Sequence, residues 1–233
     1  MQEAIKEIIS LHLGKVLINE KLSNYTTYRV GGKVRAIIYP KGEEELIKLV
    51  GLLKEKDIKY FVLGNGSNVL FSDELYDGII IKLDNFNKIS INDNEITVGA
   101  GYPLIKLSND AMRNSLIGLE FASGIPGTVG GAVFMNAGAY GEDMSKIVES
   151  VQVLTSDLKI KTFTNKQMKF SYRTSILQDH LDHSIYNRLL RRGYQWSILK
   201  HVSYHRYNES LQGCLLVSIP SIGRVPCRLP VWR

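Results

Sequence analysis

The sequence predicts an α+β fold. Segments typical of strands, of helices and of further strands follow one another along the chain in a mixture. With 44% apolar and 22% charged residues, the composition is that of an ordinary soluble globular protein. A chain of 233 residues is long enough to bury one large core or two modest ones.

The first part of the chain predicts two helices that flank an extended stretch. Residues 2–13 have a helical pattern, and residues 24–40 form an extended stretch that turns at Gly31-Gly32 and ends in a strand over residues 34–39. Residues 43–54 are expected to form an amphipathic helix because their apolar side chains fall on one face. These side chains are Leu46, Leu49, Val50 and Leu53.

A buried strand over residues 60–63 leads directly into a glycine loop. The elements expected after it are strands over residues 78–83, 88–91 and 96–99, a helix from Pro103 to about Asn114, a glycine-dense segment over residues 123–141, and strands between about residues 147 and 163. Pro103 suits the start of a helix because the missing N–H of proline costs nothing there.

The charge distribution argues against a nucleic-acid partner. The net charge is +6, but residues 1–178 hold 21 Lys and Arg against 20 Asp and Glu, whereas residues 179–233 hold 8 against 3. A nucleic-acid-binding protein should carry its basic stripe on the folded part. No run of eighteen apolar residues is present to span a membrane, and the N-terminus does not read as a secretory signal, so we expect a cytoplasmic location.

The composition changes near Gln178. Up to that residue the chain has 17 Lys and 4 Arg, and after it 1 Lys and 7 Arg; both Trp, both Cys and four of the five His also follow it. We hypothesise that the sequence beyond Gln178 is frameshifted or otherwise non-native, or a truncated replacement of a further domain. The alternative is a genuine short basic extension.

The expected organisation is therefore an N-terminal helix (1–20), a main domain (21–178) and a divergent basic tail (179–233). Cys214 and Cys227 lie thirteen residues apart without a second Cys/His pair, which predicts neither a metal site nor a disulfide.

The first glycine loop directly follows the strand over residues 60–63. It consists of Gly64, Asn65, Gly66, Ser67 and Asn68. Small residues there let backbone N–H groups turn outward as a nest for an anion such as a pyrophosphate. The alternative is a plain hairpin turn, since Asn-Gly is the strongest turn dipeptide.

The second glycine loop spans residues 123–132 and reads Ser-Gly-Ile-Pro-Gly-Thr-Val-Gly-Gly-Ala. Glycines weaken helices and strands by roughly 0.5–1 kcal/mol each, so a cluster of them within an apolar stretch indicates a positional requirement. Close approach of the backbone to a flat or phosphorylated ligand is one such requirement. A flexible linker is the alternative, but linkers are polar and this segment is not.

Five segments, in this order and spacing, resemble the UDP-N-acetylenolpyruvoylglucosamine reductase family. They are residues 64–68, Gly99-Ala100-Gly101, residues 123–132, Asn136-Ala137-Gly138-Ala139-Tyr140-Gly141 and Ser171-Tyr172-Arg173-Thr174-Ser175. The resemblance covers about residues 24–178. The first loop alone would indicate only the wider flavoprotein fold of the vanillyl-alcohol-oxidase type; the second loop followed by Tyr-Arg-x-Ser is much more specific.

The resemblance implies a two-subdomain FAD-binding fold of the vanillyl-alcohol-oxidase (PCMH) type, with FAD held non-covalently between α+β subdomains. In this family NADPH reduces the flavin, and the enolpyruvyl ether of UDP-N-acetylglucosamine is then reduced to UDP-N-acetylmuramate, a peptidoglycan precursor. Residues 64–68 would hold the FAD pyrophosphate. The contacts expected along the flavin are Ser123, Gly124, Ile125, Gly127, Thr128, Gly130, Gly131 and Ala132.

The same resemblance implies that Arg173 is catalytic. It matches the family arginine that stabilises the enol form of the intermediate and binds the substrate carboxylate, which suits a permanently charged, bidentate guanidinium. Without the surrounding motif, Arg173 would read as a surface strand arginine. Tyr172 either lines the same pocket or packs beneath the sheet.

The chain then departs from the family pattern. The family has a C-terminal substrate domain with a proton-donating serine and an assisting glutamate, and neither is found after Gln178. Ser221 lies in a faint echo of the serine loop, but Arg224 replaces its second serine, and Glu209 precedes the echo. We therefore expect impaired activity. Two alternatives stay open: a flavin-binding module without turnover, and another flavin oxidase of the same fold that acts on an alcohol or sugar.

Overall fold

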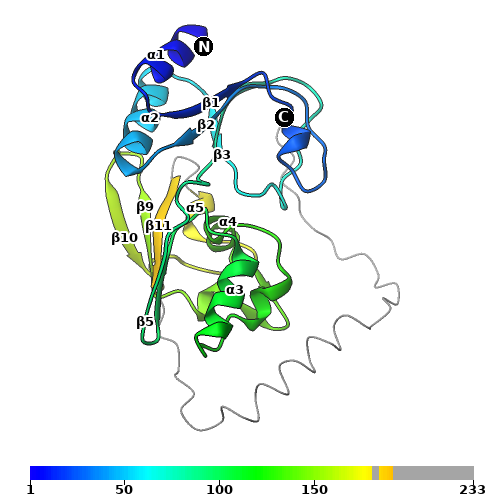
Figure 1. Cartoon of the computed structure of the whole chain (residues 1–233), viewed down its shortest axis with the longest axis vertical. Coiled ribbons are helices and arrows are strands. Elements are labelled where there is room, and N and C mark those ends of the chain that lie inside the picture. The colour runs from blue at the N-terminus through cyan, green and yellow to red at the C-terminus, as the bar shows by residue number, and fades with distance from the viewer. Residues whose placement is uncertain (180–183, 191–233) are drawn as a thin grey trace.

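A computed structural model describes residues 1–179 and 184–190, which form two subdomains, each built on its own β-sheet (Figure 1). Their elements alternate irregularly between helix and strand, and the predicted α+β fold is confirmed. None of the helices in the described part is long and apolar enough to cross a membrane.

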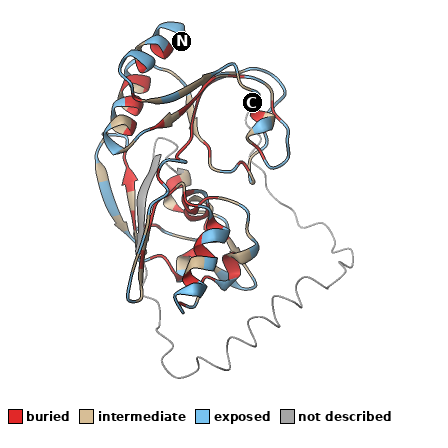
Figure 2. Ribbon diagram, viewed as in Figure 1, coloured by how far each residue is buried: buried red, intermediate tan, exposed pale blue. Residues whose placement is uncertain are grey.

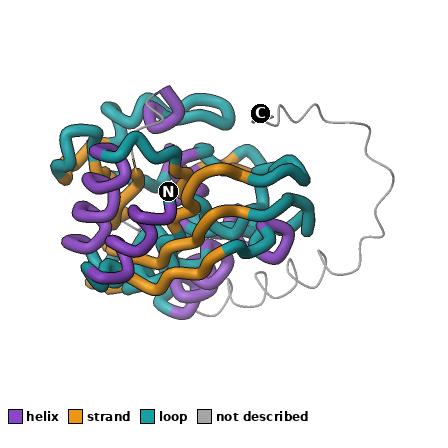
Figure 3. Tube along the Cα trace, turned by 90° about the horizontal axis from the view of Figure 1, so that it is seen from above, coloured by secondary structure: helices purple, strands orange, loops and turns teal. Residues whose placement is uncertain are grey.

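The first subdomain has a four-stranded sheet in the order β1-β2-β4-β3. Its elements are α1 (Gln2–Ser10), β1 (Gly14–Ile18), β2 (Val34–Pro40), α2 (Glu43–Glu55), β3 (Tyr60–Val62) and β4 (Tyr76–Ile81). β1 pairs antiparallel with β2, whereas β2 and β3 both run parallel to β4. Seen from above, α1 and α2 lie on one side of the strands, and the strands continue into long loops on the other side (Figure 3).

Apolar residues pack against both faces of this sheet, because successive side chains along a strand point to opposite faces. On β2, Ala36 and Ile38 point into the larger core, which includes the apolar face of α2, whereas Ile37 points into a smaller core under the loops. Phe71 closes this smaller core and makes an edge-to-face contact with Phe61, with ring centroids 5.7 Å apart.

The second subdomain has a five-stranded antiparallel sheet in the order β10-β9-β11-β6-β5. Its elements are β5 (Ile89–Asn92), β6 (Glu95–Val98), α3 (Leu104–Arg113), α4 (Val129–Phe134), the small hairpin β7 (Gly138–Ala139) and β8 (Glu142–Asp143), β9 (Ser150–Leu154), β10 (Ile160–Thr164), α5 (Ile176–Asp179) and β11 (Ser184–Leu190). β11 pairs with both β9 and β6 and thereby joins the two hairpins of the sheet.

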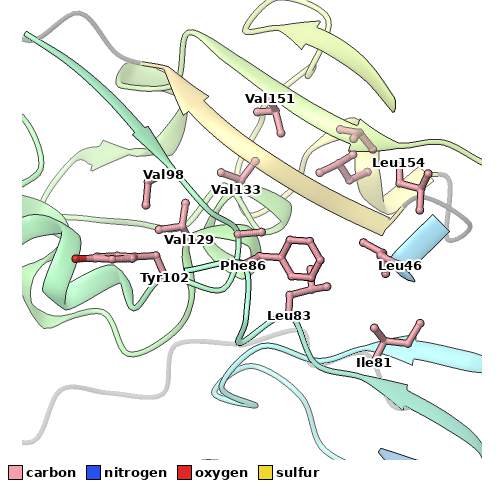
Figure 4. Packing of buried hydrophobic residues seen from close by; sticks show 14 of the residues in the cluster. Leu46, Ile81, Leu83, Phe86, Val98, Tyr102, Val129, Val133, Val151 and Leu154 are labelled. Carbon is pink, nitrogen blue, oxygen red and sulfur yellow. The ribbon is translucent and has the colours of Figure 1, made fainter. Parts of the chain in front are cut away.

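The larger core runs without interruption from one subdomain to the other. Buried residues line the inner faces of both sheets and of the helices between them (Figure 2). Leu46 from α2 and Ile81 from β4 belong to the same cluster as Val133 from α4 and Val151 from β9 (Figure 4). The two subdomains are thus fixed by shared apolar packing.

Most predicted elements are confirmed within a few residues, with three differences. The N-terminal helix ends at Ser10, and the rest of the expected segment 1–20 does not stand apart, because Gly14–Ile18 pairs with β2 as the edge strand β1. The glycine-rich stretch over residues 129–134 is the helix α4. Residues 184–190, within the expected tail, form β11; Ser221, Cys214 and Cys227 lie outside the described residues.

Candidate functional site

The structure brings the two predicted glycine loops together between the subdomains. The hydroxyl of Ser67 in the first loop donates a hydrogen bond of 2.8 Å to the carbonyl of Pro126 in the second. Gly64 lies so close to Thr128 that an added Cβ would stand 2.6 Å from the Thr128 hydroxyl oxygen. The loops are therefore one composite surface, although nearly sixty residues separate them in the sequence.

The backbone of the first loop is polarised. Its carbonyls face the protein: the Gly64 carbonyl accepts from Lys82 Nζ at 2.7 Å, the Asn65 carbonyl from Thr27 Oγ1 at 3.4 Å, and the Gly66 carbonyl from Thr27 N at 3.1 Å. The N–H groups of residues 64–68 have no acceptor in the described part of the chain. Buried or half-buried N–H groups require partners, so this row is free to bind an anion.

Gly66 makes this arrangement possible. Its φ of +65° lies in the left-handed region, and an added Cβ would stand 2.5 Å from the Tyr25 carbonyl oxygen. A larger residue would push the loop away from residues 25–27, and the Gly66 carbonyl would lose its backbone partner.

Lys82 places a buried positive charge under the first loop. The residue is 6% exposed, and besides the Gly64 carbonyl its ammonium contacts the carboxylate of Asp84 at 3.3 Å. β4 ends directly before it, which fixes the lysine at the boundary between the subdomains. A cation behind a row of N–H groups increases the attraction for a phosphate.

The second loop is tied to the segment over residues 100–104. The Gly127 carbonyl accepts from Leu104 N at 3.0 Å, while Val129 N and Gly130 N donate to the carbonyls of Tyr102 and Ala100 at 2.9 and 2.8 Å. The side chain of Thr128 caps α4 by accepting from Gly131 N at 3.3 Å. This capping supports a helix that two glycines weaken.

The predicted contact residues of this loop fall into two groups. Gly130 is buried, and a Cβ there would stand 2.9 Å from Ala100 Cβ, so helix packing alone requires glycine at this position. Gly124 is exposed, and a Cβ there would meet nothing within 4 Å. The rest also divide: Thr128 and Ala132 are buried, Gly131 is exposed, and Ser123, Ile125 and Gly127 are half-buried. Only the open positions are available for contact with a ligand.

Arg173 lies at the tip of a tight turn near the far end of α4. Ser171 and Thr174 exchange backbone hydrogen bonds of 3.1 and 3.2 Å across this turn, and Arg173 adopts a left-handed φ of 56°. Such a conformation is uncommon outside glycine and costs of order 1–3 kcal/mol, so it persists only where the surroundings impose it.

Three buried or half-buried side chains impose it. Asn136 Nδ2 donates to the Ser171 carbonyl at 2.9 Å, and Ser175 Oγ donates to the Phe134 carbonyl at 2.8 Å. Gln178 Nε2 donates both to the Phe134 carbonyl at 2.9 Å and to the Arg173 carbonyl at 3.1 Å. The turn is therefore fixed to the C-terminal end of α4, whose other end carries the second glycine loop; a six-residue helix is about 9 Å long.

Tyr172 is 85% exposed, so its ring does not pack beneath the sheet. The guanidinium of Arg173 lies over this ring, 5.9 Å from the centroid, and Arg173 is itself exposed. Both side chains are thus accessible to a ligand.

Lys82, Thr27, Asn136 and Gln178 were not predicted as site residues. Lys82 had a sequence signal, because it is a single charge at the end of the apolar run Ile79-Ile80-Ile81. The other three act through backbone contacts to residues at least five positions away, which no local pattern reveals.

These residues fit the pyrophosphate and flavin of FAD: a row of unpaired N–H groups, a buried cation behind it, and open glycines beside it. A family model described as an FAD binding domain matches residues 34–164. Within residues 1–179 and 184–190, no cluster of three His, Cys, Asp or Glu side chains is placed to hold a metal ion.

Comparison with known proteins gives the same picture. The UDP-N-acetylenolpyruvoylglucosamine reductase of Halalkalibacterium halodurans is 45% identical over 179 residues, 76% of this chain and 60% of that protein. The crystal structure of the corresponding reductase from Thermus caldophilus superposes with a TM-score of 0.67 at 31% identity, covering 86% of this chain and 68% of that one. Glucooligosaccharide oxidase from Acremonium strictum shares the fold alone, with a TM-score of 0.59 at 13% identity over 82% of this chain and 43% of that one.

The fold is therefore the FAD-binding fold of the vanillyl-alcohol-oxidase (PCMH) type. The chain spans about 60% of the length of the curated relatives it matches. Those relatives share one activity, and they match this chain over the segment that carries both glycine loops and the Arg173 turn. From this match we conclude that the chain belongs to the UDP-N-acetylenolpyruvoylglucosamine reductase family.

Proposed function

We propose that the protein is an FAD-dependent oxidoreductase of the cytoplasm. It reduces UDP-N-acetylglucosamine enolpyruvate to UDP-N-acetylmuramate with NADPH, a step in peptidoglycan precursor synthesis. The observation that carries the FAD part of this proposal is the polarised first loop, whose carbonyls are bonded inward and whose N–H groups over residues 64–68 are left for an anion. The substrate and the donor are taken from the family to which the chain belongs.

In this proposal residues 64–68 and Lys82 bind the pyrophosphate, and the open positions of the second loop lie along the flavin. The bound flavin supplies hydride transfer. Arg173 binds the substrate carboxylate and stabilises the negative charge that develops on it, while Tyr172 lines the same pocket. Turnover by this chain is expected to be slow, because the family's proton-donating serine and assisting glutamate have no counterpart among residues 179–233.

Gly124→Ala tests the cofactor site with little risk to the fold. A Cβ at residue 124 meets no protein atom within 4 Å, so the unfolding transition should not change. If flavin lies against this backbone, the variant should lose FAD affinity, measured by titrating FAD into the apoprotein and following its absorbance. Unchanged affinity in this variant would remove Gly124 from the site.

Arg173→Ala tests the chemistry, with Arg113→Ala, on the exposed surface of α3, as the matched control. The readout is reoxidation of NADPH-reduced flavin by the enolpyruvyl sugar nucleotide under anaerobic conditions. The Arg173 variant should retain FAD and lose about 100-fold or more of the substrate-dependent rate. If the parent chain binds FAD but shows no response to this substrate, a flavin-binding module without turnover is the correct description. A response to a simple alcohol or sugar instead would favour an oxidase.

A further inference from the structure

A cavity lies in the first subdomain, and none of its lining residues belongs to the two glycine loops. Its volume is about 720 Å³, and it opens between the segment over residues 19–33 and the loop over residues 72–75. Three cationic side chains line it, from Lys21, Arg29 and Lys33, with a single carboxylate from Asp73. None of these four side chains forms an ion pair within the described part of the chain.

Two of the cations are held opposite each other. Lys21 and Lys33 are partners in an isolated antiparallel bridge, which the hydrogen bonds from Leu22 N to the Gly32 carbonyl (2.8 Å) and from Ser23 N to the Gly31 carbonyl (3.2 Å) continue. Like charges directly opposite one another across a strand pair are destabilising. A bound anion would offset this repulsion.

The third cation is placed by an unusual backbone. Arg29 has a left-handed φ of 53°, and its N–H bonds to the Thr26 carbonyl at 3.1 Å. Gly32 N donates to the Ser72 carbonyl at 2.8 Å, which fixes the opposite wall and with it Asp73. The charged residues therefore converge on the cavity from a braced backbone.

The cavity also has an apolar wall. Val30 and Leu75 line it and are 37% and 44% exposed, although both are large hydrophobic residues. Clustered cations, an exposed apolar surface and one carboxylate match a phosphorylated nucleoside: the cations bind the phosphate, the apolar side chains contact the base, and Asp73 accepts from a hydroxyl or amino group.

We propose that this cavity binds the phosphate-bearing part of a nucleotide. The proposal rests on the proposed function only for the three molecules that could supply this nucleotide: the nicotinamide donor, the UDP-sugar and the ADP half of FAD. The cavity lies near the first glycine loop in space. Thr27, two residues before Arg29 in the sequence, donates its backbone N–H to the Gly66 carbonyl at 3.1 Å.

The test compares Lys21→Met/Lys33→Met with Lys48→Met/Lys88→Met in the full chain with its bound flavin. The control removes the same charge at exposed positions that do not line the cavity. Calorimetric titrations with adenosine 2′,5′-bisphosphate and with UDP, and the FAD content after purification, probe the three sources. We expect the cavity variant to weaken one of them about tenfold. The melting temperature of its apoprotein should equal or exceed that of the parent apoprotein, because the like-charge pair is gone.

The measurement that changes identifies the ligand. Loss of FAD content indicates the ADP half of FAD. Loss of bisphosphate binding indicates the nicotinamide donor, and loss of UDP binding indicates the sugar nucleotide. The proposal is overturned if the parent and the cavity variant do not differ in any of the three, or if the control loses as much as the cavity variant. Failure of the proposed function would instead appear as absent flavin or absent substrate response in the parent itself.

Discussion

At the scale of single residues, the site depends on which end of each peptide group is bonded to the protein. In the first loop the carbonyls of Gly64, Asn65 and Gly66 are bonded inward and the N–H groups are not. The proposed anion site thus depends on contacts that the loop carbonyls make with the protein, and Lys82 supplies one of these contacts.

Replacing Lys82 by Met should weaken FAD binding. The substitution keeps most of the buried apolar stem but removes the donor to the Gly64 carbonyl and the charge behind the loop. A hydrogen bond to a charged group contributes about 1.5–3 kcal/mol, so the Kd for FAD should rise about tenfold or more. Lys88→Met, at an exposed position, should bind FAD as the parent does; equal affinities for the two variants would exclude the role of Lys82.

Gln178→Ala should release the turn that holds Arg173. The substitution removes the hydrogen bonds to the Phe134 and Arg173 carbonyls, which should lower the free energy of unfolding by about 1–2 kcal/mol. The substrate-dependent rate should fall while FAD affinity is retained, because Gln178 forms its side-chain hydrogen bonds with Phe134, Met135 and Arg173 and not with the two glycine loops. Gln178→Glu replaces the amide donor with a second acceptor oxygen and should not restore the rate. A variant with normal kinetics would show that the turn holds without Gln178.

At the scale of elements, the sequence predicted best where side-chain pattern and backbone preference agree. β2 and α2 were predicted within one residue of their observed ends, because alternation and an amphipathic stripe mark them clearly. β1 was missed because only three apolar residues, Val16, Leu17 and Ile18, mark it and its register comes from β2. α4 was missed because a Val-Gly-Gly-Ala sequence has poor helix propensity; its Thr128 cap and its packing on Ala100 are what stabilise it.

The two glycines of α4 should respond in opposite directions to alanine. Gly130→Ala forces a Cβ to 2.9 Å from Ala100 Cβ and should lower the free energy of unfolding by about 1–3 kcal/mol. Gly131 is exposed, and an added Cβ there would meet only Thr128 Oγ1, at 3.4 Å. Gly131→Ala should therefore raise the free energy of unfolding by up to about 1 kcal/mol. Urea unfolding of the apoprotein measures both, and a shared direction of change would contradict this assignment of packing and open glycines.

At the scale of the whole molecule, the composite site could be predicted only as separate motifs. Both glycine loops and the Arg173 motif were located from the sequence, but their joining depends on contacts such as that between Ser67 and Pro126 and on a core shared by both subdomains. The cavity near Arg29 had no sequence signal, because its cations come together only when the segment over residues 19–33 closes on the loop over residues 72–75.

Stability should fall at high pH because four tyrosines, Tyr25, Tyr39, Tyr76 and Tyr102, have a pKa above the ordinary value. Burial raises the pKa of Tyr76 to about 12. The pKa of Tyr102 is also raised to about 12, mainly by burial and secondly by the hydrogen bond to Asp110. The pKa of Tyr39 is raised to about 12, mainly by burial and secondly by the charge of Asp84. The folded state therefore favours the neutral phenols. Their contribution is complete below pH 10, the ordinary pKa, and is lost as the pH rises toward 12.

The urea midpoint should accordingly be flat from neutral pH up to pH 10 and decline above it. Tyr76→Phe should make this decline shallower, whereas Tyr140→Phe, at a position that is 88% exposed, should leave it unchanged. The same slope in all three proteins would mean that some other group governs the alkaline transition.

The position of β11 sets the order in which this molecule is completed on the ribosome. All four strands of the first sheet have been synthesised once Ile81 has emerged, so that sheet can form early. The second sheet consists until then of two separate hairpins, β5 with β6 and β9 with β10, each of which pairs locally. Only when residues 184–190 leave the exit tunnel does β11 join them, so the second subdomain closes last and its hairpin edges stay open to wrong partners for the longest time.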